Sequence, residues 1–94
     1  MSRPDLQSRP CLAPYARLKT DPVSGDPVLL FPEGLLVLNS TAHEIVSRCD
    51  GEATIAELVQ RLAEEFDAPK ETLLDDVLEN LEALRQRNLL VFAP

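Results

Sequence analysis

Residues 35–42 of the sequence, Leu-Leu-Val-Leu-Asn-Ser-Thr-Ala, change within two positions from an extended apolar run to the start of a helix. Four successive aliphatic side chains bounded by turn residues are typical of a strand covered on both faces, because alternate side chains point to opposite faces of a sheet. The residues before this run favour sheet, and most of those after it favour helix. If helices cover only one side of the sheet, the other side is left for a partner peptide or a second subunit.

The size and charge of the chain exclude several classes of protein. Ninety-four residues are enough for one domain with a modest core and too few for two domains. A net charge of −7 repels phosphate backbones and anionic lipids, so neither nucleic acid nor a membrane is an expected partner. No apolar run reaches membrane-spanning length, and the N-terminus lacks the apolar core of a secretion signal, which predicts a cytoplasmic protein with reduced cysteines.

The first part of the chain predicts a small antiparallel sheet. Residues 1–14 contain three prolines and little apolar material, which indicates a flexible tail in front of a domain at 15–94. Three short strands are expected, at residues 15–20, 28–31 and 35–38. The turns between them are short, which predicts a meander with the second strand in the middle. The third strand is then an edge, unless the apolar segment 89–92 or a second subunit pairs with it.

The second part of the chain predicts three helices. Thr41 with Glu44, and Thr54 with Glu57, fit the capping-box pattern at the starts of the first two helices. The first helix is expected to stop at Asp50-Gly51, and the third to run from Pro69 to Asn88. Apolar residues follow helical spacing in the second helix at Ile55, Leu58, Val59, Leu62 and Phe66, and in the third at Leu74, Val77, Leu78, Leu81 and Leu84. With segment 89–92 as a closing strand, the fold class is α+β and resembles a winged helix-turn-helix.

No group of residues indicates catalysis or a bound cofactor. His43 lies one helical turn from Ser47, but the chain has no glycine-rich cradle or loop cluster that would build a pocket around them. Asp75 and Asp76 fit the solvated face of the third helix, and Cys49 fits a small packed side chain. One histidine and two distant cysteines do not make a metal site. We therefore expect a protein that is not an enzyme and that binds neither metal nor cofactor.

Two classes of function remain open on the residues alone. A free edge at the third strand can accept an extended peptide by strand addition, with the neighbouring third helix as the wall of a groove. The alternative is an acidic winged-helix domain of a regulator, which dimerises or binds another protein. DNA binding is disfavoured because carboxylates fill the first half of the third helix.

Three motifs make the sequence recognisable: Leu-Leu-Phe-Pro-Glu-Gly at 29–34, Leu-Asn-x-Thr-Ala-x-x-Ile at 38–45, and Cys-Asp-Gly at 49–51. Their order and spacing resemble the PqqD family of pyrroloquinoline quinone (PQQ) biosynthesis, over about residues 15–92. The resemblance implies a noncatalytic chaperone, or recognition element, for a ribosomally made peptide. It would bind the precursor peptide PqqA and present it to the radical SAM enzyme PqqE, which joins a Glu and a Tyr of the peptide.

The resemblance also implies where the peptide binds. In related recognition domains, the leader peptide adds as a strand beside the third strand and packs on the third helix. The residues expected to contact it here are Leu35, Leu36, Val37, Leu38, Asn39, Leu74, Val77, Leu78 and Leu81. A homodimer is also expected to be accessible, because the same apolar edge can pair with its copy.

Overall fold

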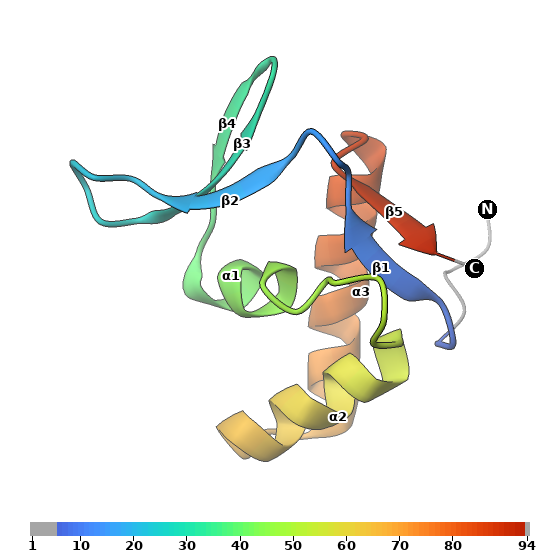
Figure 1. The fold of residues 1–94 in the computed structure, drawn as a ribbon. Helices are drawn as coiled ribbons and strands as arrows, with labels where there is room; N and C mark the ends of the chain where they lie inside the picture. Colours follow the sequence, from blue (N-terminus) through green and yellow to red (C-terminus); the bar gives the residue numbers. More distant parts are fainter. Residues whose placement is uncertain (1–5, 94) are drawn as a thin grey trace.

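The computed structural model describes residues 6–93 and confirms the α+β fold class (Figure 1). The elements in chain order are β1 (Arg9–Leu12), β2 (Arg17–Thr20), β3 (Pro27–Phe31), β4 (Gly34–Val37), α1 (Ser40–Val46), α2 (Ile55–Phe66), α3 (Lys70–Gln86) and β5 (Leu90–Ala93). In Figure 1, α3 stands in the centre of the molecule. The β1–β5 ribbon lies to one side of it, and the three-stranded sheet with α1 lies to the other.

The three-stranded sheet has the predicted meander topology. β2, β3 and β4 are antiparallel in that order, with β3 in the middle. The closing strand β5 pairs with β1 and not with β4, which resolves one alternative left open by the sequence. Within residues 6–93, β4 therefore has a strand partner on one side only.

One face of this sheet covers the core. Leu18, Leu29 and Leu36 stand opposite one another on the three strands and share that face. Leu29 is fully buried, and the other two pack at the margin of the core. The helices supply the rest of the core through their predicted apolar stripes, including Ile45, Ile55, Leu58, Val77 and Leu81. Phe66 is the exception among the predicted stripe residues of α2, because 52% of it is exposed.

The observed helix ends agree with the sequence prediction except at two points, both in α1. The capping box of α2 is present, with the Thr54 hydroxyl accepting from the Glu57 amide and the Glu57 carboxylate accepting from the Thr54 amide. The N-cap of α1 is Asn39 and not Thr41, because the Asn39 side chain reaches the amide of Ala42 at 2.7 Å. The first helix also ends at Val46, before the predicted stop at Asp50-Gly51.

The N-terminal segment departs most from the sequence prediction. Residues 6–13, which were expected to belong to a flexible tail, form a strap across the domain. β1 pairs with β5, and outside that ladder Ser8 accepts a hydrogen bond from the Ile55 amide at 3.0 Å. Pro10 is among the largest fully buried side chains. Local composition did not reveal this order because the strap is held by contacts with residues more than forty positions away; residues 1–5 lie outside the described part of the chain.

The Cys-Asp-Gly motif at 49–51 explains how the strap is attached. The Asp50 carboxylate accepts hydrogen bonds from the amides of Glu52 and Ala53 at 2.9 and 3.1 Å, which shapes the turn after α1. Gly51 has a left-handed backbone with φ of 79° and donates its amide to the Pro10 carbonyl. Cys11 and Asp50 form an isolated bridge between the two segments. The motif is therefore a structural clasp for β1.

Candidate functional site

The outer edge of β4 carries unpaired backbone groups. Leu38 donates its amide to the carbonyl of Pro27 at 3.0 Å, and the register places Val37 opposite Val28. In an antiparallel pair, residues alternate between those that bond to the neighbouring strand and those whose N–H and C=O point away from it. The amides and carbonyls of Leu35 and Val37 therefore point outward from the sheet. These groups can receive a further strand.

A pocket lies near the end of β4, between the three helices. Its volume is about 270 Å³, and it begins at Ser40, three residues after β4 ends. Ile45, Leu62 and Val77 are buried residues that contribute apolar lining. The remaining lining residues are Ser40, Thr41, Glu44, Phe66, Leu73 and Asp76. The pocket can accept an apolar side chain, with hydroxyls and two carboxylates near it to hold a polar or cationic neighbour.

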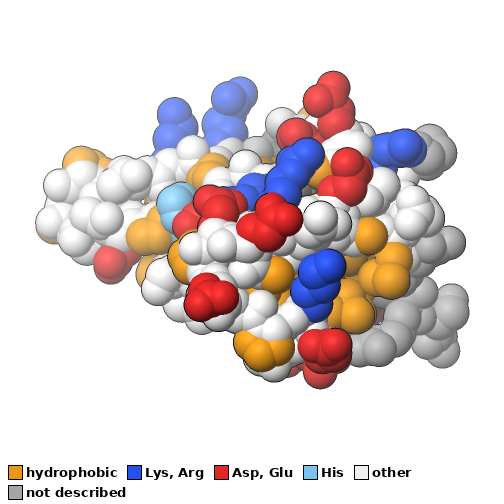
Figure 2. All heavy atoms as spheres, turned by 90° about the horizontal axis from the view of Figure 1, so that it is seen from below, with side chains coloured by type: hydrophobic (Ala, Val, Ile, Leu, Met, Phe, Trp, Pro, Cys, Tyr) orange, Lys and Arg blue, Asp and Glu red, His pale blue; other side chains and the backbone are white. Residues whose placement is uncertain are grey.

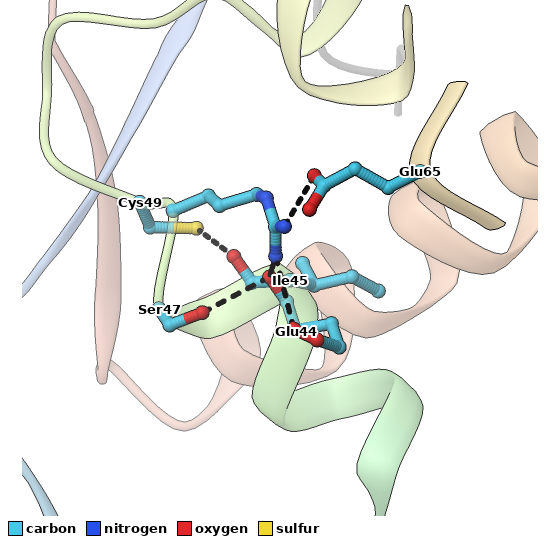
Figure 3. A network of polar contacts seen from close by, with 6 residues as sticks. Glu44, Ile45, Ser47, Cys49 and Glu65 are labelled. Atoms are coloured by element: carbon cyan, nitrogen blue, oxygen red, sulfur yellow. Dashed lines mark hydrogen bonds and ion pairs between the residues drawn. The ribbon is translucent and has the colours of Figure 1, made fainter. Parts of the chain in front are cut away.

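A hydrogen-bond network around Arg48 joins α1 to α2 beside this pocket (Figure 3). The guanidinium donates to the Glu44 carbonyl at 2.7 Å, pairs with the Glu44 carboxylate at 3.2 Å, and reaches the Glu65 carboxylate on α2. Because Glu44 and Phe66 both line the pocket, the network holds the α1 wall against the end of α2. Because the Glu65 carboxylate is exposed, its ion pair with Arg48 should contribute only modestly to stability. Its main effect is to position α1 relative to α2.

The predicted contact residues from 35–39 divide into two groups. Leu35 and Val37 are 54% and 61% exposed, which leaves both their side chains and their outward backbone groups accessible. Leu36 faces the core, Leu38 is buried, and Asn39 is occupied as the N-cap of α1. An added strand would meet the first pair directly, while the other three hold β4 and α1 in place.

The predicted contact residues of α3 are more scattered than the sequence suggested. Val77 lines the pocket, while Leu78 and Leu81 are buried in the core. Leu74 lines a separate hollow with Leu6 and Val59, and this hollow shares no lining residue with the pocket. Of these four predicted residues, one lines the pocket, two face the core and one lines another surface, so their contact with a peptide stays a prediction.

Sequence reasoning missed Leu73, Asp76 and Phe66, which line the pocket. Leu73 stands three and four positions before Asp76 and Val77, so the three lie on one helical stripe. The doublet Leu73-Leu74 was the available signal, because two adjacent leucines in a helix cannot both face the same direction. Phe66 was assigned to the core stripe of α2, and only its position at the end of that helix leaves it exposed at the pocket.

The nucleophile and metal candidates do not form a second site. Burial, followed by the charges of Asp50 and Cys11, raises the pKa of the Cys49 thiol to about 12, so it stays protonated near neutral pH. Both cysteines are free thiols. Among residues 6–93, no three His, Cys, Asp or Glu side chains gather in a way that would hold a metal ion.

The helical side of the molecule has a mixed surface. Figure 2 shows acidic and basic side chains scattered over it, with hydrophobic side chains between them. No helix in the described residues is long and apolar enough to cross a bilayer.

Comparison with known proteins places this chain in one family. Residues 27–90 match the family model for coenzyme PQQ synthesis protein D, PqqD. The PqqA binding protein of Xanthomonas axonopodis pv. citri is 38% identical over 90 residues, which cover 96% of this chain and 98% of that protein. The PqqA binding protein of Rhizobium meliloti is 39% identical over 79 residues, covering 84% of this chain and 81% of that protein.

A solved structure agrees with these sequence matches. It is the solution NMR structure of the PqqD truncation of Methylobacterium extorquens PqqCD, described as a functional, stand-alone recognition element for ribosomally synthesized and post-translationally modified peptides. It superposes with a TM-score of 0.76 at 32% sequence identity, over 87% of each chain. The match in sequence and in fold shows that this chain belongs to the PqqD family of coenzyme PQQ synthesis proteins.

Proposed function

We propose that this protein binds the precursor peptide PqqA by strand addition to β4 and presents it to the radical SAM enzyme PqqE. The family is one of peptide-recognition elements and not of enzymes. The relatives named above are PqqA binding proteins, which supports the same ligand for this chain.

The open edge of β4 is the observation that carries the proposal. Leu35 and Val37 each offer one outward N–H and one outward C=O, so an extended peptide gains up to four main-chain hydrogen bonds there. These main-chain hydrogen bonds contribute affinity that does not depend on the amino-acid sequence of the peptide. Side chains that alternate along the added strand supply the selectivity.

The pocket near the end of β4 would bind one of the side chains of the added peptide strand. An added strand that continues past Val37 reaches the start of α1, where Ser40 and Thr41 line the pocket. An apolar side chain buried there contributes about 1.5–3 kcal/mol. Glu44 and Asp76 favour a neutral or basic residue next to it.

Presentation to the enzyme follows from holding the peptide by its backbone. A peptide tethered to a domain that also docks on the enzyme reaches the active site at a raised effective concentration. The domain itself supplies no catalytic group in this scheme, so it should have no activity alone.

The proposal is tested first by titrating the purified protein with synthetic PqqA and following backbone amide NMR signals. The expected result is saturable binding with the largest shifts in β4 and around the pocket. Single-turnover cross-linking by PqqE, with and without this protein, then measures presentation. Tethering predicts stimulation that fades when the peptide already saturates the enzyme. Failure to bind the peptide would instead favour the acidic regulatory domain as the alternative.

The same edge supports a second, competing interaction. β4 of one copy can pair with β4 of another, because no strand within residues 6–93 pairs with that edge. Light scattering at high protein concentration should then detect a homodimer that dissociates when PqqA is added. A protein that stays monomeric throughout would exclude this interaction.

A further inference from the structure

The face of the sheet that points away from the core has a regular composition. Two rows of side chains cross it from β2 through β3 to β4, and each row begins with a cation and continues with two aliphatic residues. The rows are Arg17, Leu30, Leu35 and Lys19, Val28, Val37. We call these six residues the outer sheet face. Its cations lie at the β2 side and its apolar part ends at the open edge of β4.

Three of the four aliphatic residues of the outer sheet face are exposed to solvent. Leu30 is 36% exposed, and Leu35 and Val37 are exposed to a greater extent, while Val28 between them is already covered. Leu35 and Val37 belong to the strand that the sequence predicted to be covered on both faces. The core covers the opposite face only. An exposed group of adjacent aliphatic side chains on a small domain marks an interaction surface.

The charge of this face is opposite to that of the whole protein. Arg17 and Lys19 are both exposed, and neither forms an ion pair within residues 6–93. Neither row contains a carboxylate. The chain as a whole carries −7, so a basic and apolar face is a local exception that selects for an acidic partner.

We propose that the outer sheet face docks a folded protein surface in which aliphatic side chains are flanked by carboxylates. Within the proposed function, on which this inference rests, that surface belongs to the radical SAM enzyme that modifies the peptide. The carboxylates meet Arg17 and Lys19, and the aliphatic side chains cover Leu30 and Leu35.

The position of the peptide edge favours the enzyme as the occupant. A peptide added to β4 becomes the next strand of the sheet, and its outward side chains stand beside Leu35 and Val37. The outer sheet face and the bound peptide then form one continuous surface. An enzyme that docks on this surface contacts the domain and its substrate together, so the peptide and the domain strengthen each other's binding to it. A second copy of this chain offers no carboxylates from these rows to meet the two cations.

The test reverses the two cations on β2, which is separated from the peptide edge by two strands. The variant Arg17→Glu/Lys19→Glu is compared with Arg61→Glu/Lys70→Glu, which makes the same change in net charge at exposed positions on α2 and α3. Affinity for the purified radical SAM enzyme is measured with PqqA present, at low and high salt, and PqqA affinity is measured separately. Thermal melting establishes that each variant is folded.

The β2 variant should lose about tenfold or more in enzyme affinity at low salt and less at high salt, while the matched control stays near wild type. Its affinity for PqqA should not change. Leu30→Ser should also weaken docking, and that loss should persist at high salt. Equal loss in both charge variants, no loss in either, or loss of self-association in place of docking would overturn the inference. Failure of the wild-type protein to bind PqqA would instead overturn the proposed function.

Discussion

Gly51 donates its backbone N–H to the carbonyl oxygen of Pro10 over 3.0 Å, and this bond joins the turn after α1 to the N-terminal strand. Gly51 has a φ of 79°, which an L side chain rarely adopts, and a Cβ atom there would stand 3.4 Å from Cys11. The turn and the strap thus depend on one residue without a side chain. The strap in turn pairs with β5 and so helps to cover the core from the end opposite β4.

Gly51→Ala should lower the free energy of unfolding by about 1–2 kcal/mol, because alanine is strained in the left-handed region. Gly25→Ala is the matched control, since Gly25 has the same φ and no atom within 4 Å of an added Cβ. The exposed turn around Gly25 can relax, so Gly25→Ala should lower the free energy of unfolding by less than Gly51→Ala does. Urea denaturation measures both variants, and equal losses would mean that the strap does not constrain Gly51.

Val37→Pro should weaken PqqA binding, because proline removes an outward N–H donor from the edge of β4. The side chain of Val37 also changes, so Val37→Ala is the control that retains the donor. We expect a loss of about 1 kcal/mol or more for the proline beyond the loss for the alanine. NMR titration of both variants measures it, after their spectra show that the hairpin is intact. Equal affinities would argue against strand addition at this edge.

Leu73→Ala should weaken PqqA binding by about 1–3 kcal/mol, because Leu73 lines the pocket near the end of β4. Leu74→Ala removes the same atoms from the next residue of α3, which lines the separate hollow beside Leu6. Both side chains are half-buried, so the two variants should lose comparable stability.

Peptide titration and thermal melting of the two leucine variants separate binding from stability. If Leu74→Ala were the variant that lost affinity, the peptide would contact the hollow beside Leu6, in agreement with the predicted contact at Leu74. If both variants bound PqqA as tightly as the wild-type protein, the peptide would contact neither Leu73 nor Leu74.

The clasp at Asp50 should make stability depend on pH. Hydrogen bonds from the amides of Ala53 and Glu52 hold the pKa of the Asp50 carboxyl below its usual value. A carboxyl whose pKa is lower in the folded state stabilises the fold above its unfolded pKa of about 3.9, and that contribution is lost as the pH falls through the folded pKa. Asp50→Asn keeps an acceptor but cannot ionise. The difference in unfolding free energy between wild type and this variant should shrink as the pH falls from ~6 to ~2.5. A constant difference would contradict this role.

Much of the fold was predictable because its determinants are local. The meander follows from alternating apolar residues between turns rich in proline and glycine, and the capping box at Thr54 and Glu57 acts within four residues. Asn88 ends α3 with a φ of 61°, as its tolerance of left-handed geometry predicted. The choice of Thr41 over Asn39 as N-cap was wrong, because both residues suit the position and only the backbone path decides between them.

The sequence alone determined that β4 is apolar on both faces and that α3 carries an apolar stripe, since side-chain alternation and helical period are properties of the chain itself. Only the tertiary structure decided which backbone groups of β4 point outward, because that depends on the register with β3. It also decided that β5 pairs with β1 and leaves the β4 edge open. On α3 it separated Leu73 from Leu74, because neighbouring residues of a helix point in different directions and packing determines which of them meets the site.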